Sequence, residues 1–501
     1  MLQLAGIITF AVLFAVFLLL GFYGRFWRKG DLSKLDEWAL GGRRFGAFIV
    51  WFLVGADLYT AYTFIAIPSS VFSIGAIYFF AVPYVAVTFG IAMWAMPKLW
   101  KVSKKEGHVT GADFVRKHFN SRSLAILVAL VGIVAELPYI ALQIVGMLSV
   151  MFVMLYGLGS IKLVSDLALI LSFLILAVFT YFSGLRGATL TAIFKDALIL
   201  FTVALVIIVA VLNIGFTKSF QSLPVKYYHL LPLQVNAYWS LFLMSALALY
   251  LYPHAITGSL SAKDPKSLRI SQSLLPLYGV GLALLALFGI LVYGSSSAHA
   301  FLLKIPAASR GTYVVPALIF YSLPSWLTGV AFLGIFIGGL VPASIMAISQ
   351  SNLLTRNIIK EIKPNLTSKG EALVAKVGTI VFLFLALGFV FLFPLSYSVQ
   401  LQLLGGILIL QTLPSIFLGL ITNKLNKYGL MAGLIVGIGY GLYLMEEANH
   451  FKTWTTTLIT LPPFNFPLFI GLIALVANLV VVLVISLIAL PFTNKNAVVE
   501  N

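Results

Sequence analysis

One carboxylate lies in the middle of a long apolar stretch near the start of the chain. Asp57 belongs to the segment Gly55-Ala56-Asp57-Leu58-Tyr59-Thr60-Ala61-Tyr62-Thr63, in which a glycine and four hydroxyl-bearing residues interrupt apolar sequence. Within a membrane this composition favours a helix that unwinds near the midplane, because free backbone groups are tolerated there when they line a protected cavity. The alternative is a regular helix in which Asp57 pairs with a polar neighbour.

The unwound segment predicts a binding site for an anion. An outer half-helix that begins near Tyr59 would direct its amide groups and the positive end of its dipole toward the centre of the protein. We therefore expect a carboxylate to bind the amides of Tyr59 to Ala61, with help from the hydroxyl groups of Thr60 and Thr63.

A second interruption, Tyr250-Leu251-Tyr252-Pro253-His254, lies in a later apolar stretch. Pro253 cannot donate to the preceding turn, and it disfavours helix at Tyr252. The segment is either the partner of the first break, with Tyr250 as a polar contact for the anion, or a kinked helix whose tyrosines mark the membrane interface. His254 could relay protons, although a lone histidine near a helix end is more often structural.

Four further polar side chains lie in apolar stretches. Glu136 precedes Gln143 by seven residues, so both share one helix face and could look into the same cavity. Gln402 and Gln411 are placed similarly further along the chain. Each of the four either contacts the ligand or only links helices by hydrogen bonds.

Lys195 and Asp196 are adjacent near the start of another apolar stretch. We expect the long Lys195 side chain to extend toward the membrane surface. Neighbours in a helix do not face each other, so Asp196 should need a separate partner.

The composition places these residues in a membrane protein. Of the 501 residues, 61% are hydrophobic and 9% are charged, against about 45–50% and about 25% in soluble domains. The absence of cysteine excludes disulfides and thiolate chemistry. The net charge of +17 does not indicate a nucleic-acid partner, because the basic residues lie in short gaps between apolar runs.

A transmembrane helix needs about 20 mostly apolar residues. Dividing the sequence at charged residues and Gly/Pro clusters predicts thirteen spans: 4–24, 46–67, 73–98, 124–157, 163–183, 188–214, 237–260, 270–296, 313–355 with its lead-in, 371–394, 396–421, 428–446 and 464–492.

The basic residues are distributed unevenly between the spans. The gaps after the first, third, seventh and ninth spans are rich in Lys and Arg, and the alternate gaps hold only scattered cations. Because cytoplasmic loops keep the excess, we predict a multi-pass protein of the plasma membrane with its N-terminus outside and its C-terminus cytoplasmic.

The sequence offers no chemistry for an enzyme. It has no phosphate-binding glycine-rich loop ending in Lys-Ser or Lys-Thr, and no His-Glu-x-x-His pair or Gly-x-Ser-x-Gly turn in a span. We therefore expect neither ATP-driven pumping nor intramembrane hydrolysis, and we expect no cofactor or bound metal.

Several short motifs, in their order along the spans, resemble the sodium:solute symporter family over nearly the whole chain. The motifs are Glu37-Trp38-Ala39-Leu40-Gly41-Gly42-Arg43-Arg44-Phe45-Gly46, Pro138-Tyr139-Ile140-Ala141-Leu142-Gln143, Ser183-Gly184-Leu185-Arg186 followed by Lys195-Asp196, Tyr252-Pro253-His254-Ala255 and Leu354-Thr355-Arg356-Asn357.

This resemblance implies an all-α integral membrane fold of about thirteen transmembrane helices, with the leucine-transporter arrangement of two inverted five-helix repeats. The whole chain, 1–501, would form one transporter domain. Repeat one would cover about 46–214 and repeat two about 237–421, with peripheral helices at 4–24, 428–446 and 464–492.

Three segments resemble the monocarboxylate permease branch of that family: Gly55 to Phe64, Ser245 to Gly258 and Leu410-Gln411-Thr412-Leu413-Pro414. Members of the branch are associated with lactate, pyruvate, acetate or propionate, and some with alanine. The resemblance implies a small organic acid as substrate. The candidate substrate-binding residues are Thr60, Ala61, Thr63, Gln143, Tyr250, His254 and Gln411.

The ion site departs from the family pattern. The resemblance implies Ala56, Tyr59 and Gly338 as backbone ligands of a sodium ion, yet Val341-Pro342 stands where two Ser/Thr hydroxyl groups should complete the site. A dehydrated cation needs several oxygen ligands, so this loss should weaken sodium binding severely.

Asp57 lies between two of these matched ligands. Because a buried carboxyl group can take up and release protons near neutral pH, we predict that a proton at Asp57 replaces sodium. Asp196 and Glu136 are the alternative proton sites.

Three functions compete at this point. The first is proton-coupled import of a small monocarboxylate by a secondary transporter in the lipid bilayer, and the second is sodium-coupled symport of another small solute such as an amino acid. The third is a membrane sensor, which should carry an output domain. Only about nine residues follow the last predicted span, so we favour the first.

Overall fold

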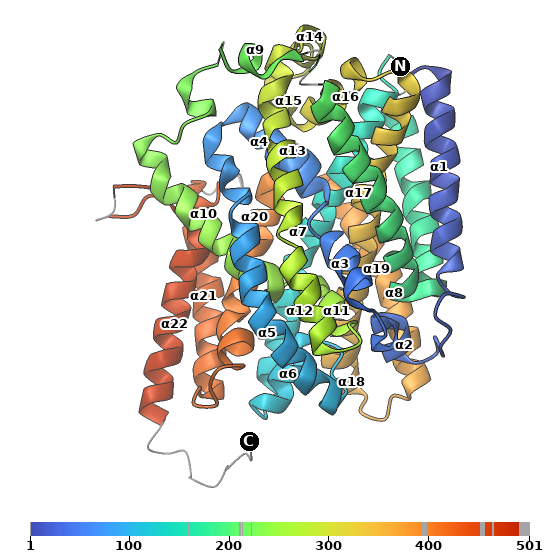
Figure 1. Ribbon diagram of the computed structural model, residues 1–501. Coiled ribbons are helices and arrows are strands. Elements are labelled where there is room, and N and C mark those ends of the chain that lie inside the picture. Colours follow the sequence, from blue (N-terminus) through green and yellow to red (C-terminus); the bar gives the residue numbers. More distant parts are fainter. Residues whose placement is uncertain are drawn as a thin grey trace.

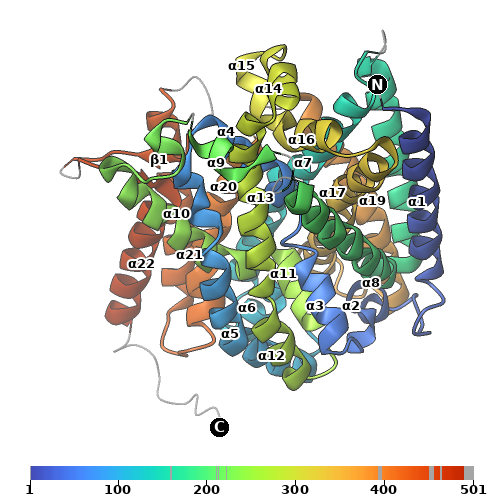
Figure 2. The same cartoon turned by 45° about the horizontal axis from the view of Figure 1, so that its top comes forward.

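A computed structural model describes residues 2–157, 161–209, 212, 214–221, 223–392, 398–450, 456–462 and 465–489. Nearly all of these residues are helical, and the long helices run between two ends of one bundle (Figure 1). Helix α1 (Leu4–Tyr23) lies along one side, and α21 (Lys427–Ala448) and α22 (Ile470–Ala489) lie along the opposite side (Figures 1 and 2). All three helices lie at the periphery of the bundle.

Within the described chain, eleven helical segments are long and apolar enough to cross a membrane. One of them, α8 (Ile161–Val209), has 49 residues and is interrupted at Gly184, where φ is 56°. At about 1.5 Å per residue it is more than twice as long as the hydrocarbon core of about 30 Å. It therefore contains the predicted span 163–183 and, as far as Val209, the predicted span 188–214.

The second predicted span, 46–67, is too interrupted to be one of the eleven. The predicted all-α membrane fold is thus confirmed. The ends of four predicted spans lie partly outside the described residues, namely 188–214, 371–394, 396–421 and 464–492.

The predicted break around Asp57 is present. Helix α3 (Ala47–Gly55) stops at the glycine, and the chain resumes as the π-helical turn η2 (Tyr62–Ala66) and the short helix α4 (Ile67–Ser73). Between them the backbone makes irregular turns, such as the bond from the Thr60 amide to the Leu58 carbonyl at 3.0 Å. The carbonyls of Val54 and Gly55 still accept from amides of the break at 3.0–3.1 Å, whereas the carbonyl of Ala56, the residue after α3, faces another part of the protein.

The second predicted break is also present. Helix α10 (Val235–Ala248) passes through the 3-10 turn η7 (Leu249–Leu251) to Tyr252, which is extended with φ −62° and ψ 136°. Helix α11 (Pro253–Leu260) then begins with its proline in the first turn, where a missing amide hydrogen costs nothing. The segment is a true interruption and not a kinked helix.

Helix α17 (Ser325–Leu354) forms the centre of the bundle. It packs against α1, α8, α7 (Arg122–Met154) and α19 (Ser368–Leu392), and its most apolar window is entirely buried. The predicted lead-in from residue 313 is a separate helix, α16 (Val314–Ser322). It ends before Pro324 because a residue that precedes proline disfavours helical geometry.

The remaining helices complete the bundle and its connections. They are α2 (Leu35–Leu40), α5 (Tyr84–Glu106), α6 (Gly111–His118), α9 (Phe216–Gln221), α12 (Pro265–Leu274), α13 (Leu277–Gly294), α14 (Ser296–Leu303), α15 (Ala307–Arg310), α18 (Lys360–Ile362) and α20 (Ser398–Ile409).

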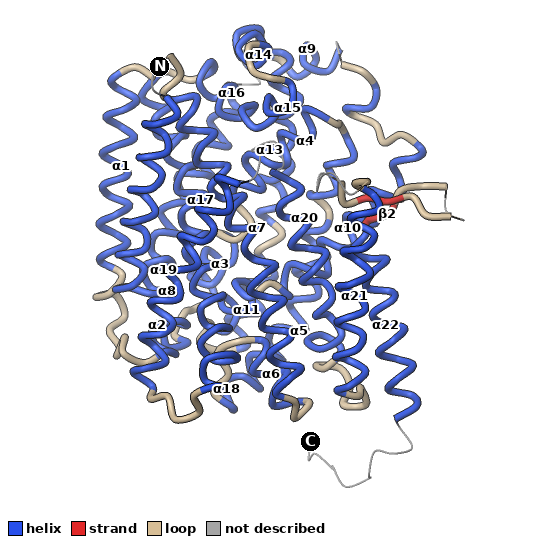
Figure 3. Tube along the Cα trace, turned by 180° about the vertical axis from the view of Figure 1, so that it is seen from behind, coloured by secondary structure: helices blue, strands red, loops and turns tan. Residues whose placement is uncertain are grey.

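One small antiparallel strand pair was not predicted from the sequence. Strands β1 (Leu458–Ile459) and β2 (Leu468–Phe469) lie at the side of the bundle (Figure 3). Two residues per strand are too few to produce an alternating pattern. Because β2 is extended, the last helix begins at Ile470 and not at the predicted residue 464.

Candidate functional site

Asp57 is buried at the first break, with a side chain that finds no partner. The residue is 2% exposed, and neither carboxyl oxygen has a hydrogen-bond partner among the described residues. A buried polar atom left unpaired costs about 1–3 kcal/mol, and more if it is charged. This geometry differs from the alternative in which Asp57 pairs with a polar neighbour, and it is suited to a carboxyl group that gains and loses a proton.

Four other ionisable side chains surround Asp57 in the membrane interior. His254, Lys195, Glu136 and Asp196 all lie within electrostatic reach of it, and all four are fully buried. The fold therefore brings together residues from the first break, the second break, α7 and α8. Buried ionisable clusters of this kind are typical of proton and ion pathways in transporters.

Lys195 binds the backbone of the first break. Its ammonium donates to the carbonyl oxygens of Ala56 and Tyr59, each at 2.9 Å. These are two of the three backbone ligands that the resemblance implied for a metal cation. The expectation that Lys195 extends to the membrane surface is wrong, because the broken helix offers unpaired carbonyl groups in the interior.

Lys195 also pairs with its neighbour in sequence. The distance between its ammonium nitrogen and Asp196 Oδ1 is 3.0 Å, and Asp196 Oδ2 accepts a hydrogen bond from the Tyr278 hydroxyl at 2.7 Å. The expectation that the two residues cannot face each other is wrong, because both side chains turn toward the break. Tyr278, on α13, was not recognised from the sequence, where one tyrosine in an apolar helix gives no signal.

The amides of the first break have partners within the chain. The Ala61 amide donates to Gln143 Oε1 at 3.0 Å, and the Tyr62 amide donates to Thr60 Oγ1 at 3.1 Å. The Thr63 hydroxyl donates to the Leu58 carbonyl. All three amides that were expected to hold a carboxylate therefore donate within the chain, those of Tyr59 and Thr60 to backbone carbonyls and that of Ala61 to Gln143.

Glu136 binds the backbone of the second break, as Gln143 binds that of the first. Its Oε1 accepts from the His254 amide at 2.9 Å and contacts His254 Nδ1 at 2.6 Å, while Oε2 accepts from the Ser349 hydroxyl at 2.9 Å. The carboxylate thereby caps the N-terminus of α11, where negative charge is favourable. Through Glu136 and Gln143, one face of α7 binds both broken helices.

Other candidates lie apart from these contacts. The Tyr250 hydroxyl donates to Gln272 Oε1, and the Gln411 amide donates to the carbonyls of Ile407 and Gly471 at 3.0 and 3.2 Å. Gln411 therefore links α20 to α22, and among the described residues it makes no hydrogen bond to either break. A role for Gln411 at the substrate remains a prediction, as does one for Tyr250.

The other part of the implied ion site lies on α17. Gly338 faces Ile199 of α8, one turn beyond Lys195, and Val341 and Pro342 are buried side chains without a polar atom. These three residues offer a cation no side-chain oxygen.

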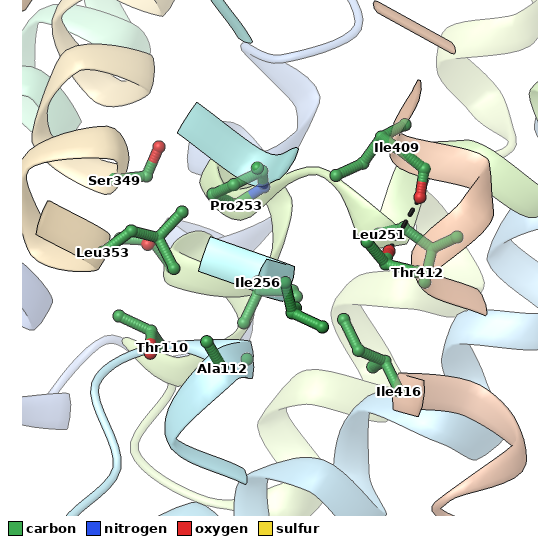
Figure 4. A pocket seen from close by; sticks show the side chains of 14 residues that line it. Thr110, Ala112, Leu251, Pro253, Ile256, Ser349, Leu353, Ile409, Thr412 and Ile416 are labelled. Atoms are coloured by element: carbon green, nitrogen blue, oxygen red, sulfur yellow. Dashed lines mark hydrogen bonds between the residues drawn. The ribbon is translucent and has the colours of Figure 1, made fainter. Parts of the chain in front are cut away.

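A small cavity of about 20 Å³ adjoins the second break (Figure 4). The residues that line it include Ser349 and Leu353 of α17, Pro253 and Ile256 of α11, Thr110 and Thr412. Its volume is enough for about one water molecule and too small for an organic acid. Because Ser349 also bonds to Glu136, the cavity lies next to the buried acidic group.

Ion pairs close the end of the bundle that carries α6 and α18. Arg356 lies 3.6 Å from Asp113 and 2.9 Å from Glu371, and it donates to the Gly107 carbonyl at 3.1 Å. Asn357 donates to Asp113 at 2.8 Å. These bonds join α6 to the end of α17 and to α19 below the small cavity.

Two broken helices that meet a buried ionisable cluster define a secondary transporter of the leucine-transporter fold. A solved Na⁺-coupled sialic acid symporter, in a substrate-bound outward-open state, has the same fold, with a TM-score of 0.72 at 16% sequence identity over 97% of this chain and 98% of that one.

The family model for the sodium:solute symporter family matches residues 38–437, and the chain belongs to this family. A monocarboxylate transport permease protein of Rhizobium johnstonii is 41% identical over 490 residues, covering 95% of this chain and 96% of that protein. An uncharacterized symporter of Bacillus subtilis, YodF, is 34% identical over 94% of this chain and 91% of its own length.

Proposed function

We propose that this protein is a proton-coupled symporter that imports a small monocarboxylate of the lactate, pyruvate, acetate or propionate class. The observation that carries the proposal is Asp57, whose two buried carboxyl oxygens have no partner among the described residues. A carboxyl group in this position favours its neutral form unless a cation is supplied. Binding a proton there also removes the repulsion that a substrate carboxylate would otherwise meet.

The name of a relative and the chemistry of the first break support this substrate class. The Rhizobium permease, at 41% identity, is described as a monocarboxylate transporter. In our proposal the substrate carboxylate takes the place of the Gln143 oxygen at the Ala61 amide. The rings of Tyr139 and Tyr252, with centroids 5.4 Å apart, would provide an apolar wall for a short acyl chain.

The transport cycle would use the two halves of the fold. Asp57 takes up its proton while the site faces outside, the substrate binds beside it, and repeat one (about 46–214) then rocks against repeat two (about 237–421) to expose the site to the cytoplasm. In this scheme the basic end of the bundle is cytoplasmic and α1 begins outside. The ion pairs of Arg356 would be broken when the inner side opens.

The proposal is tested by uptake into proteoliposomes of the purified protein. Labelled lactate, pyruvate, acetate and propionate are each offered with an inward proton gradient, an inward sodium gradient, both or neither. For one proton per acid, a difference of one pH unit should drive about tenfold accumulation without sodium, since about 1.4 kcal/mol corresponds to a factor of ten. Protein-free liposomes correct for undissociated acid that crosses the lipid.

Variants at Asp57 locate the coupling. Asp57→Asn should abolish accumulation by the proton gradient and leave exchange of internal for external substrate partly intact, because Asn resembles the protonated carboxyl group in shape. Asp31→Asn, at an exposed position, is the matched control and should behave as the wild type. If Asp57→Asn still accumulates substrate normally, the proton site lies elsewhere, and Glu136 and Asp196 become the next variants.

A sodium-coupled symporter of another small solute, such as an amino acid, is the alternative. Membership of the sodium:solute symporter family favours it. This function would appear in the same experiment as uptake that requires sodium and does not respond to the proton gradient. Alanine and proline are therefore included in the panel of substrates.

A further inference from the structure

We propose that the Lys195 ammonium is a built-in cation that permanently occupies the ion position of the first break. The proton coupling of the proposed function makes this arrangement useful, but the inference itself rests on the contacts of Lys195. Its side chain would bind the unwound backbone in the way that a bound metal ion does in a sodium-coupled transporter. The protein would then need no sodium to keep the broken helix in shape.

Two backbone oxygens of the first break converge on the ammonium nitrogen of Lys195. The carbonyls of Ala56 and Tyr59 lie on either side of Asp57, and both accept from Lys195 at 2.9 Å. Ala56 is the C-cap residue of α3, so its carbonyl lies at the negative end of a half-helix dipole. Unwound carbonyls and half-helix C-termini are the groups that bind coupling cations in this class of fold.

The Lys195 ammonium also leaves no position for a metal ion at these carbonyls. A metal at the same two carbonyls would displace the hydrogen bonds of Lys195 and would face its positive charge at short range in a medium of low dielectric constant. On the α17 side of the site, Val341 and Pro342 offer no side-chain oxygen. A metal ion could therefore bind these carbonyls only by displacing Lys195.

Lys195 is itself held in place by its neighbours. Asp196 lies 3.0 Å from the ammonium and balances its charge, and the Tyr278 hydroxyl fixes Asp196 at 2.7 Å. The ring of Tyr278 packs so closely on Gly55 that an added Cβ would lie 2.2 Å from it. With Lys195 paired in this way, Asp57 is the acidic group of the break that is left to change its charge.

The test replaces Lys195 and supplies a free cation. In Lys195→Ala, two carbonyl oxygens and the Asp196 carboxylate would surround an empty position of the size of an ammonium group. We expect folded Lys195→Ala to lose at least about tenfold in pyruvate uptake in sodium-free medium, and to recover several-fold when sodium or methylammonium is added. Wild-type uptake, and that of the exposed control Lys263→Ala, should not respond to either cation.

Binding of labelled ²²Na⁺ to the purified wild-type protein gives an independent answer that does not depend on transport or on the folding of a variant. We expect no saturable binding. Saturable sodium binding by the wild type overturns the inference, as does a folded Lys195→Ala variant that transports normally without sodium or stays inactive with every cation. Failure of wild-type monocarboxylate uptake would instead count against the proposed function alone.

Discussion

Glu136 should be the most important buried acid for stability, because it caps a helix that belongs to another part of the chain. Glu136→Ala removes the acceptor of the His254 amide and of the His254 ring. Leaving a buried partner of a charged pair unmatched costs about 3–5 kcal/mol. The lost hydrogen bond from Ser349 should cost less, because the Ser349 hydroxyl also donates to the Met346 carbonyl at 2.7 Å.

Glu136→Gln should be milder. The side-chain carbonyl can still accept from the His254 amide, so the loss is that of one charge-assisted hydrogen bond, about 1.5–3 kcal/mol net. Thermal unfolding of the purified variants in detergent, followed by tryptophan fluorescence, gives the order of stability. The control is Glu447→Ala at an exposed position of α21. Equal unfolding temperatures for Glu136→Ala and this control would refute the role of Glu136 as a cap of α11.

Three further predictions test other contacts. Gly281→Ala places a Cβ 1.8 Å from the Tyr59 hydroxyl, so it should destabilise the protein by about 1–3 kcal/mol in the same unfolding assay, and an unchanged midpoint would contradict the packing. Gln143→Glu places a negative charge beside the Ala61 amide. We expect this variant to raise the KM for pyruvate about tenfold or more, which is equivalent to about 1.4 kcal/mol. An unchanged KM would show that Gln143 is not part of the binding site. Arg356→Ala removes two ion pairs from one end of the bundle. A cysteine introduced as Ala112→Cys beside the small cavity should then react faster with a maleimide added at that end. An equal reaction rate with and without Arg356→Ala would show that these ion pairs do not hold that end closed.

The membrane fold was predictable from the sequence because the bilayer fixes the length of each apolar segment. The breaks at Asp57 and Pro253 were predictable as well, since polar residues and proline inside apolar stretches leave few other arrangements. What hydropathy cannot give is the pairing of distant helices. Hydropathy did separate the two halves of α8, because the predicted gap between the spans 163–183 and 188–214 includes Gly184, where the backbone is not helical.

The candidate site was predictable only in part. The spacing of Glu136 and Gln143 indicated one helix face, and the structure shows that each bonds to a different break. Lys195 was misplaced, because a lysine near the end of an apolar stretch ordinarily reaches the membrane surface. Its actual partners are backbone carbonyls, which carry no signal in the residue types.

In the proposed cycle, Asp57 carries the proton that moves with the substrate. The most direct measurement is the acidification of the lumen of proteoliposomes that contain a pH dye, when pyruvate is added outside in sodium-free medium. We predict substrate-dependent proton entry for the wild type, in proportion to pyruvate uptake, and none for Asp57→Asn. Pyruvate uptake by the wild type without proton entry, or equal proton entry in the Asp57→Asn variant, would contradict the account.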